Sequence, residues 1–118
     1  MSSPAERLAE SRSRLEAQLR EIDAELTGIR GSRSESTADD EHDPEGSTVS
    51  ADWSRAVGLR ASTIVALDEV EAAVLRLAEG SYGLCVNCGR PIAAGRLEAR
   101  PAAALCIDCA SGVPPRGR

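Results

Sequence analysis

The sequence predicts a mainly α-helical protein, in which two long helices form an antiparallel coiled-coil hairpin and a small four-cysteine module follows. Apolar residues recur at alternating spacings of three and four over residues 4–30 and 50–78, as in a coiled-coil seam. A segment rich in glycine, serine and acidic residues separates the two stretches. The only four cysteines of the chain fall near its C-terminus, in two Cys-x-x-Cys pairs.

The first helix is predicted from its start signal and its seam. Ser3 supplies a capping hydroxyl, Pro4 suits the first turn, and Glu6 follows three residues after the serine. Gly31 is a plausible stop. The seam residues are Leu8, Leu15, Leu19, Ile22, Leu26 and Ile29.

Residues 31–50 break the apolar pattern and carry a dense acidic cluster. Its carboxylates repel one another, so folding alone has no evident use for them. The cluster is either a solvated linker or a tip that binds a partner, and a magnesium-binding loop is a further alternative. The acidic residues are Asp39, Asp40, Glu41, Asp43 and Glu45, and among them lies the only histidine, His42.

The second helix is predicted over residues 50–78 and ends at Gly80. Its length matches that of the first, so the two can pair as a hairpin with the acidic tip between them. Trp53 is expected either to pack in the seam or to anchor a partner. The seam residues are Trp53, Ala56, Thr63, Leu67, Val70, Val74 and Leu77.

The two cysteine pairs, Cys85 with Cys88 and Cys106 with Cys109, have the spacing of a tetrahedral site for one zinc ion. Four protein thiolates close the shell, so the site is structural. A redox-active dithiol, two disulfides or iron are the alternatives. Structural zinc contributes roughly 10–16 kcal/mol in finger peptides, so the metal is expected to decide whether this module folds.

Arginines near the cysteines are expected to offset the formal charge of a zinc ion with four thiolates, to be ordinary surface charge, or to face a partner or ligand. They are Arg90, Arg96 and Arg100. The chain as a whole carries a net charge of −5, which disfavours an autonomous nucleic-acid binder.

No stretch approaches the ~20 apolar residues that cross a bilayer, and we expect a cytoplasmic protein. No arrangement of nucleophile, base or paired carboxylates suggests an enzyme. The predicted organisation is a hairpin over residues 1–79 with its tip at about 31–50, a zinc finger over 80–112 and a flexible tail over 113–118.

Residues 80–89 (GSYGLCVNCG), 96–101 (RLEARP) and 105–109 (LCIDC) closely resemble the zinc finger of the TraR/DksA family. The resemblance implies a transcription regulator that binds RNA polymerase and does not read promoter DNA. It implies that the coiled coil enters the secondary channel of the polymerase while the zinc base stays at the mouth. The acidic tip, with Asp39, Asp40, Asp43 and Glu45, would then act near the catalytic magnesium ion.

Two family motifs are matched only in part. The tip motif Asp-x-x-Asp-Ala finds its aspartates in Asp40 and Asp43, but Pro44 replaces the alanine. Members that bind guanosine tetraphosphate use an arginine, matched by Arg100, and lysines, at whose positions Glu69 and Ala110 stand. Strong synergy with the alarmone is therefore not expected. The rival functions are a thiol- or zinc-responsive redox switch, a general protein-interaction module and a DNA-binding zinc ribbon.

Overall fold

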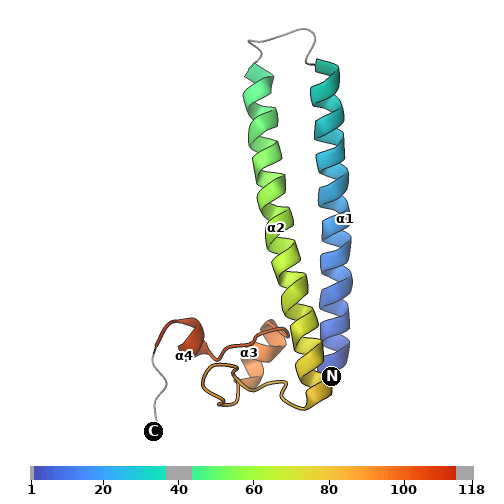
Figure 1. Ribbon diagram of the computed structural model, residues 1–118. Helices are drawn as coiled ribbons and strands as arrows, with labels where there is room; N and C mark the ends of the chain where they lie inside the picture. The colour runs from blue at the N-terminus through green and yellow to red at the C-terminus, as the bar shows by residue number, and fades with distance from the viewer. Residues whose placement is uncertain (1, 37–43, 114–118) are drawn as a thin grey trace. The chain divides into compact units, whose positions relative to one another are not determined.

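The computed structural model describes residues 2–36 and 44–113, and the side chains of residues 2–30 and 49–113. The fold is mainly α-helical, as predicted, and in the described residues its only β pairing is an antiparallel bridge between Leu84 and Pro91. None of the described helices is both long and apolar enough to span a membrane. The helices are α1 (Pro4–Ser36), α2 (Pro44–Glu79), α3 (Ala94–Ala99) and α4 (Ile107–Ala110) (Figure 1).

The predicted capping signal at the start of α1 is present as a reciprocal pair of hydrogen bonds. The backbone N–H of Glu6 donates to the Ser3 hydroxyl at 3.2 Å, and the Ser3 N–H donates to the Glu6 carboxylate at 3.3 Å. Two N–H groups that the first helical turn leaves without a backbone partner are satisfied in this way.

The end of α2 is fixed by Gly80, whose φ of +84° suits a residue without a side chain. The Gly80 N–H donates to the Leu77 carbonyl at 3.3 Å, and the Ser81 N–H donates to the Arg76 carbonyl at 2.9 Å. These two bonds form a Schellman motif, so the chain leaves the helix in a defined direction toward the cysteines.

Both long helices extend further than the sequence pattern predicts. Helix α1 continues through Gly31 to Ser36, and α2 begins at Pro44, within the segment assigned to the tip. A single glycine inside a helix costs only about 1 kcal/mol, so it does not have to end one. Proline at the first helical position needs no N–H partner and therefore starts α2 readily.

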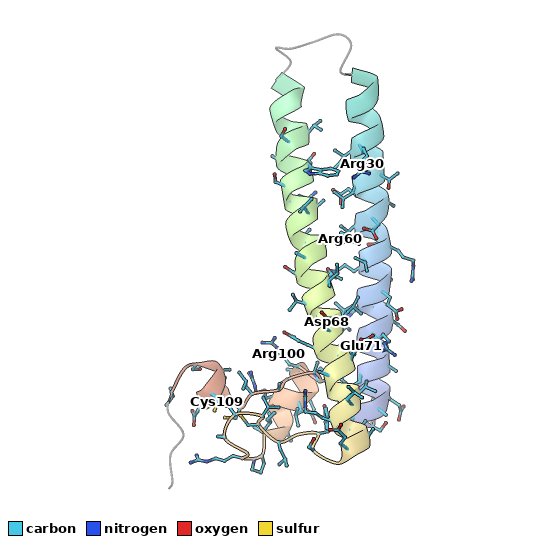
Figure 2. All side chains as sticks on the ribbon, viewed as in Figure 1. Arg30, Arg60, Asp68, Glu71, Arg100 and Cys109 are labelled. Carbon is cyan, nitrogen blue, oxygen red and sulfur yellow. The ribbon has the colours of Figure 1, made fainter. Side chains whose placement is uncertain are left out.

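The chain divides into two compact units: residues 14–66, here the coiled-coil unit, and residues 1–13 with 67–118, here the finger unit. In the coiled-coil unit, α1 and α2 lie side by side and run antiparallel (Figure 2). Residues farther along α1 pair with residues nearer the start of α2, as expected for antiparallel helices. The pairs are Gln18 with Thr63 (2.8 Å), Asp23 with Arg60 (2.7 Å), Glu25 with Arg55 (2.8 Å) and Arg30 over the Trp53 ring (5.5 Å to its centroid).

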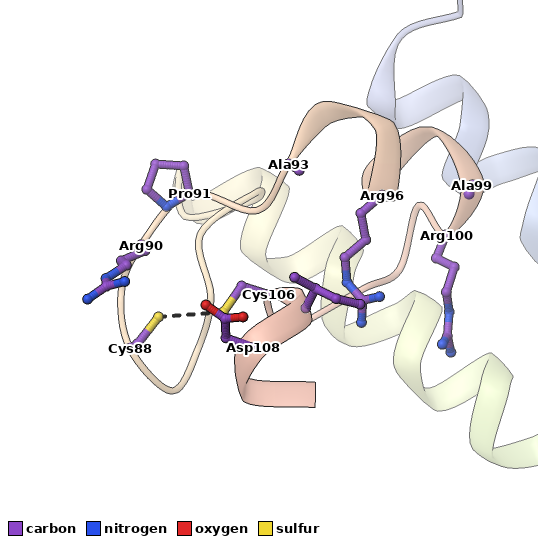
Figure 3. Close-up of a pocket in the computed structure, with 10 residues that line it drawn as sticks. Cys88, Arg90, Pro91, Ala93, Arg96, Ala99, Arg100, Cys106 and Asp108 are labelled. Carbon is purple, nitrogen blue, oxygen red and sulfur yellow. Dashed lines mark hydrogen bonds between the residues drawn. The ribbon is translucent and has the colours of Figure 1, made fainter. Parts of the chain in front are cut away.

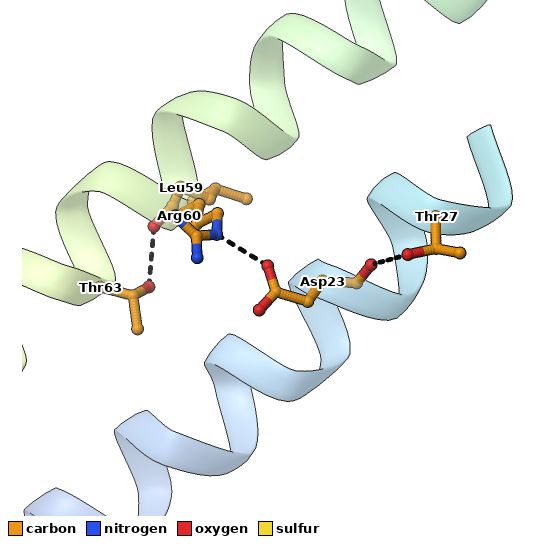
Figure 4. A network of polar contacts seen from close by, with 5 residues as sticks. All are labelled: Asp23, Thr27, Leu59, Arg60 and Thr63. Atoms are coloured by element: carbon orange, nitrogen blue, oxygen red, sulfur yellow. Dashed lines mark hydrogen bonds and ion pairs between the residues drawn. The ribbon is translucent and has the colours of Figure 1, made fainter. Parts of the chain in front are cut away.

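A buried threonine sits in the middle of this seam. Thr63 is 1% exposed, and its hydroxyl donates to the Leu59 carbonyl at 2.7 Å (Figure 4). The same hydroxyl accepts from the Gln18 side-chain amide. Because the hydroxyl is fully satisfied, its burial carries no desolvation penalty from a missing partner. A polar pair at one level of an otherwise apolar seam also favours a single register of the two helices.

In the finger unit the seam takes a different residue from the one predicted. Val74 was expected in the seam, but it is 40% exposed, and Ala73 is fully buried in its place together with Leu8 and Val70. Spacings of three and four are both compatible with a helical stripe, so the pattern does not distinguish Ala73 from Val74. Between the same helices, Arg12 and Glu71 form an exposed ion pair at 3.1 Å.

This difference predicts opposite outcomes for two adjacent substitutions. Ala73→Gln forces an amide into a packed seam and should lower the free energy of unfolding by about 2 kcal/mol. Val74→Gln changes an exposed position and should alter it by about 0.5 kcal/mol or less. Urea titration followed by circular dichroism at 222 nm measures both. An equal loss for the two variants would contradict the observed burial.

Candidate metal centre

The four cysteines come together from two short segments of the finger unit. Cys85 and Cys88 lie on the turn that follows α2, and Cys106 and Cys109 lie at the start and within α4. Their four Sγ atoms all lie within 4.8 Å of one another, and the Cys88 and Cys106 sulfurs are 3.8 Å apart. A tetrahedron with Zn–S bonds of about 2.3 Å has corners about 3.8 Å apart, so the cluster fits one zinc ion.

The backbone holds the first cysteine turn in shape. The Gly89 N–H donates to the Cys85 carbonyl at 2.9 Å, and Gly89 adopts a φ of +76°, which side chains disfavour. The Cys85 N–H donates to the Arg90 carbonyl at 2.8 Å, closing the turn from the other side. The Val86 N–H reaches across to the Ala104 carbonyl at 2.9 Å, so the two cysteine segments are joined before any metal is considered.

The charge on the sulfurs is softened by nearby N–H donors. The Asn87 side-chain amide donates to the Cys109 sulfur at 3.3 Å, and the Cys109 N–H donates to the Cys106 sulfur at 3.5 Å. In the described residues no arginine donates a hydrogen bond to a sulfur, although Arg90, Arg96 and Arg100 line a pocket together with Cys88 and Cys106. Asn87 was not singled out from the sequence, although its place inside the first Cys-x-x-Cys pair was the available signal.

The thiols differ strongly in acidity. The backbone N–H of Cys88 outweighs the opposing effect of burial and lowers the pKa of Cys85 to about 6. The Asn87 amide lowers the pKa of Cys109, but burial and the three neighbouring sulfurs together outweigh it and raise that pKa to about 12. Four thiolates as close together as these repel one another, so a bound cation would stabilise the fully ionised cluster. All four residues are free cysteines rather than disulfides.

Two further bonds brace the segment between the cysteine pairs. The Tyr82 hydroxyl donates to the Pro101 carbonyl at 2.6 Å, and the Arg96 Nε donates to the Leu105 carbonyl at 2.9 Å. One N–H of the Arg96 guanidinium is therefore hydrogen-bonded to the backbone just before Cys106. Long-range bonds of this kind depend on the folded chain and leave no pattern in the sequence.

The geometry agrees with a match of residues 80–114 to the prokaryotic dksA/traR C4-type zinc finger. The finger of this chain is therefore similar to that of the TraR/DksA family. Among its relatives is the RNA polymerase-binding transcription factor DksA of Haemophilus influenzae, 46% identical over 43 residues, which are 36% of this chain and 30% of that protein. The protein of the same name in Escherichia coli is 42% identical over 43 residues, covering 36% and 28% of the two chains. This chain thus matches less than a third of the length of these curated relatives.

A solved structure extends the similarity beyond the finger. Transcription factor DksA2 from Pseudomonas aeruginosa aligns with a TM-score of 0.51 and 28% sequence identity, covering 89% of this chain and 81% of that one. The likeness therefore includes the helical hairpin as well as the four-cysteine module.

The other predicted site residues fall into two groups. Asp39, Asp40 and Asp43 lie outside the described residues, and Glu45 lies in the first turn of α2 with its side chain undescribed. By contrast, the three positions compared with alarmone-binding relatives line one pocket of about 270 Å³ in the finger unit. They are Glu69, Arg100 and Ala110, and Arg76 and Arg96 line the same pocket.

The positive φ of Gly89 predicts a selective loss of zinc affinity. Gly89→Ala places a side chain in a left-handed conformation at a cost of about 1–2 kcal/mol, so zinc should bind about ten-fold more weakly. Gly95→Ala is the matched control, since Gly95 lies in α3 with open space around it and should keep parental affinity. Competition with a chromophoric zinc chelator measures both affinities. Equal affinities of the two variants would show that the turn does not depend on Gly89.

Proposed function

We propose that this protein is a transcription regulator that binds RNA polymerase. The observation that carries the proposal is the dksA/traR zinc finger on a chain whose hairpin also resembles transcription factor DksA2. Curated relatives that share the finger are named RNA polymerase-binding transcription factors. The proposal assigns this chain no catalytic step.

In this proposal the coiled coil enters the secondary channel of the polymerase and the zinc finger rests at the channel mouth. The polar pairs along the coiled-coil unit support a rod with one register, because they join α1 to α2 at successive levels. A rod that cannot slide in register can hold its tip at a fixed depth. The zinc shell is closed by protein ligands, which suits a structural base rather than a reactive centre.

The acidic tip would act near the catalytic magnesium ion of the polymerase. Its proposed residues are Asp39, Asp40, Asp43 and Glu45. Carboxylates close to a metal-dependent centre can perturb the metal, the nucleotide or mobile catalytic elements through charge at short range. Pro44 follows Asp43 where the family motif has alanine, so this tip has a distinct local chemistry.

Guanosine tetraphosphate is expected to have little effect on this protein. The pocket lined by Arg100 also contains the Glu69 carboxylate and the uncharged Ala110, where alarmone-binding relatives carry lysines. The Glu69 carboxylate opposes a polyphosphate and offsets part of the positive charge of Arg76, Arg96 and Arg100, which line the same pocket. We therefore propose regulation that depends mainly on the polymerase itself.

Replacing Asp40 and Asp43 by Asn tests the tip. The double variant removes two charges at constant size, so run-off transcription with purified polymerase should lose most of the regulatory effect while helicity and zinc content stay unchanged. The control is a Glu16→Gln, Glu21→Gln variant, which removes two exposed carboxylates from α1 and should act like the parent. Guanosine tetraphosphate should change the parental effect by less than about two-fold, since the pocket lacks the two lysines.

Two results would contradict this account in different ways. If the parent protein does not co-purify with RNA polymerase, the proposed function is wrong. If it binds but the double Asn variant regulates as strongly as the parent, the tip has no role and the acidic run is a solvated linker.

A further inference from the structure

An apolar groove of about 450 Å³ lies beside the sulfur cluster in the finger unit. Pro91 and Ala93 line it from the segment before α3, and Ala99 from the end of α3 (Figure 3). Ile107, the first residue of α4, also lines it. Ile107 is 62% exposed, which is high for a large aliphatic side chain. The volume lies in the range of pockets that hold a ligand or the side chains of a partner segment.

The groove is rimmed by positive charge although the chain is acidic overall. Arg90, Arg96 and Arg100 line it, and Asp108 is the one carboxylate among its lining residues. Figure 3 shows the side chains of Arg96, on α3, and Arg100, directly after α3, side by side, with Arg90 on the other side of the groove. Three arginines thus line the groove beside one carboxylate and the two zinc-ligand residues Cys88 and Cys106, in a protein whose net charge is −5.

These arginines are not consumed by the structure around them. Arg96 uses its Nε on the Leu105 carbonyl and keeps its terminal amino groups. In the described part of the chain, no ion pair or side-chain hydrogen bond engages Arg90 or Arg100. A zinc ion with four thiolates would add a formal −2 nearby, but the donors to the sulfurs are Asn87 and a backbone N–H.

We propose that this groove docks an acidic segment of the partner protein, with an aliphatic or aromatic side chain in the groove and carboxylates on the rim arginines. The inference rests on the proposed function, in which the partner is RNA polymerase. A guanidinium fork suits a planar carboxylate because it can bind both oxygens. An apolar side chain would cover the exposed Ile107 and the proline and alanine walls, as an interface anchor does. A free phosphate would leave those walls in water.

Two exposed aliphatic residues provide a matched test of the groove. Val86 is 61% exposed and Ile107 is 62% exposed, and each directly follows the first cysteine of its pair, but only Ile107 lines the groove. Binding of the zinc-loaded full chain to purified RNA polymerase is measured by biolayer interferometry. Ile107→Ser should weaken binding about ten-fold, whereas Val86→Ser should change it by less than about two-fold.

Charge reversal and crosslinking test the chemistry of the occupant. Arg90→Glu should slow association and reduce its salt dependence, because it repels a carboxylate-bearing segment. A p-benzoylphenylalanine at Ala99 should crosslink to a polymerase peptide that combines Asp or Glu with apolar residues, identified by mass spectrometry. Ala99 is exposed and is not a zinc ligand, so the crosslinker should leave the zinc site intact. The crosslink tests the occupant independently of Ile107→Ser and Arg90→Glu.

The outcomes separate the two proposals. If the parent binds polymerase while Ile107→Ser and Arg90→Glu, with zinc retained, bind equally well, the groove proposal is overturned and the proposed function stands. A crosslink to a basic segment, or none during saturated binding, also overturns it. Failure of the parent to bind overturns the proposed function and this inference together.

Discussion

The fold of the finger unit depends on the cluster of four cysteine sulfurs that can bind one zinc ion. The segment from Gly80 to Val113 contains only two short helices, of six and four residues, and the chain has no phenylalanine to build an aromatic core. Cys85 and Ile92 are the only buried residues described in this segment. So small a core does not stabilise the fold by itself, and four thiolates around zinc supply the missing cross-link. Zinc binding contributes roughly 10–16 kcal/mol of folding free energy in comparable finger peptides.

The remaining contacts of the finger set directions rather than supply most of the stability. The Val86 to Ala104 hydrogen bond and the Arg96 bond to Leu105 position the second cysteine pair against the first. The same hydrogen bonds bring α3 close to the sulfur cluster. The groove and its arginines therefore lie directly beside the metal site. The zinc site and the proposed docking surface therefore depend on the same local fold. The coiled-coil unit is held by a separate set of contacts.

Part of this could be predicted because some signals are local. Cysteine spacing indicates the zinc ligands, since the ligand geometry is encoded within each pair, and Ser3 with Glu6 indicates the start of α1. Other features depend on how the elements pack. Ala73 rather than Val74 enters the seam because alternating spacings leave the phase of the stripe open. The hydrogen bond from the Asn87 amide to the Cys109 sulfur, and the groove itself, are formed by segments that only the folded chain brings together.

The most direct test of the central claim is the removal of zinc followed by residue-resolved NMR. Amide signals of a ¹⁵N-labelled sample are recorded with zinc and after treatment with a strong chelator. The account predicts that signals from residues 80–113 lose their dispersion while those from residues 14–30 and 49–66 of the coiled-coil unit stay in place, and that zinc restores the spectrum. Dispersed signals from residues 80–113 in metal-free protein would show that the finger folds without the four-thiolate shell.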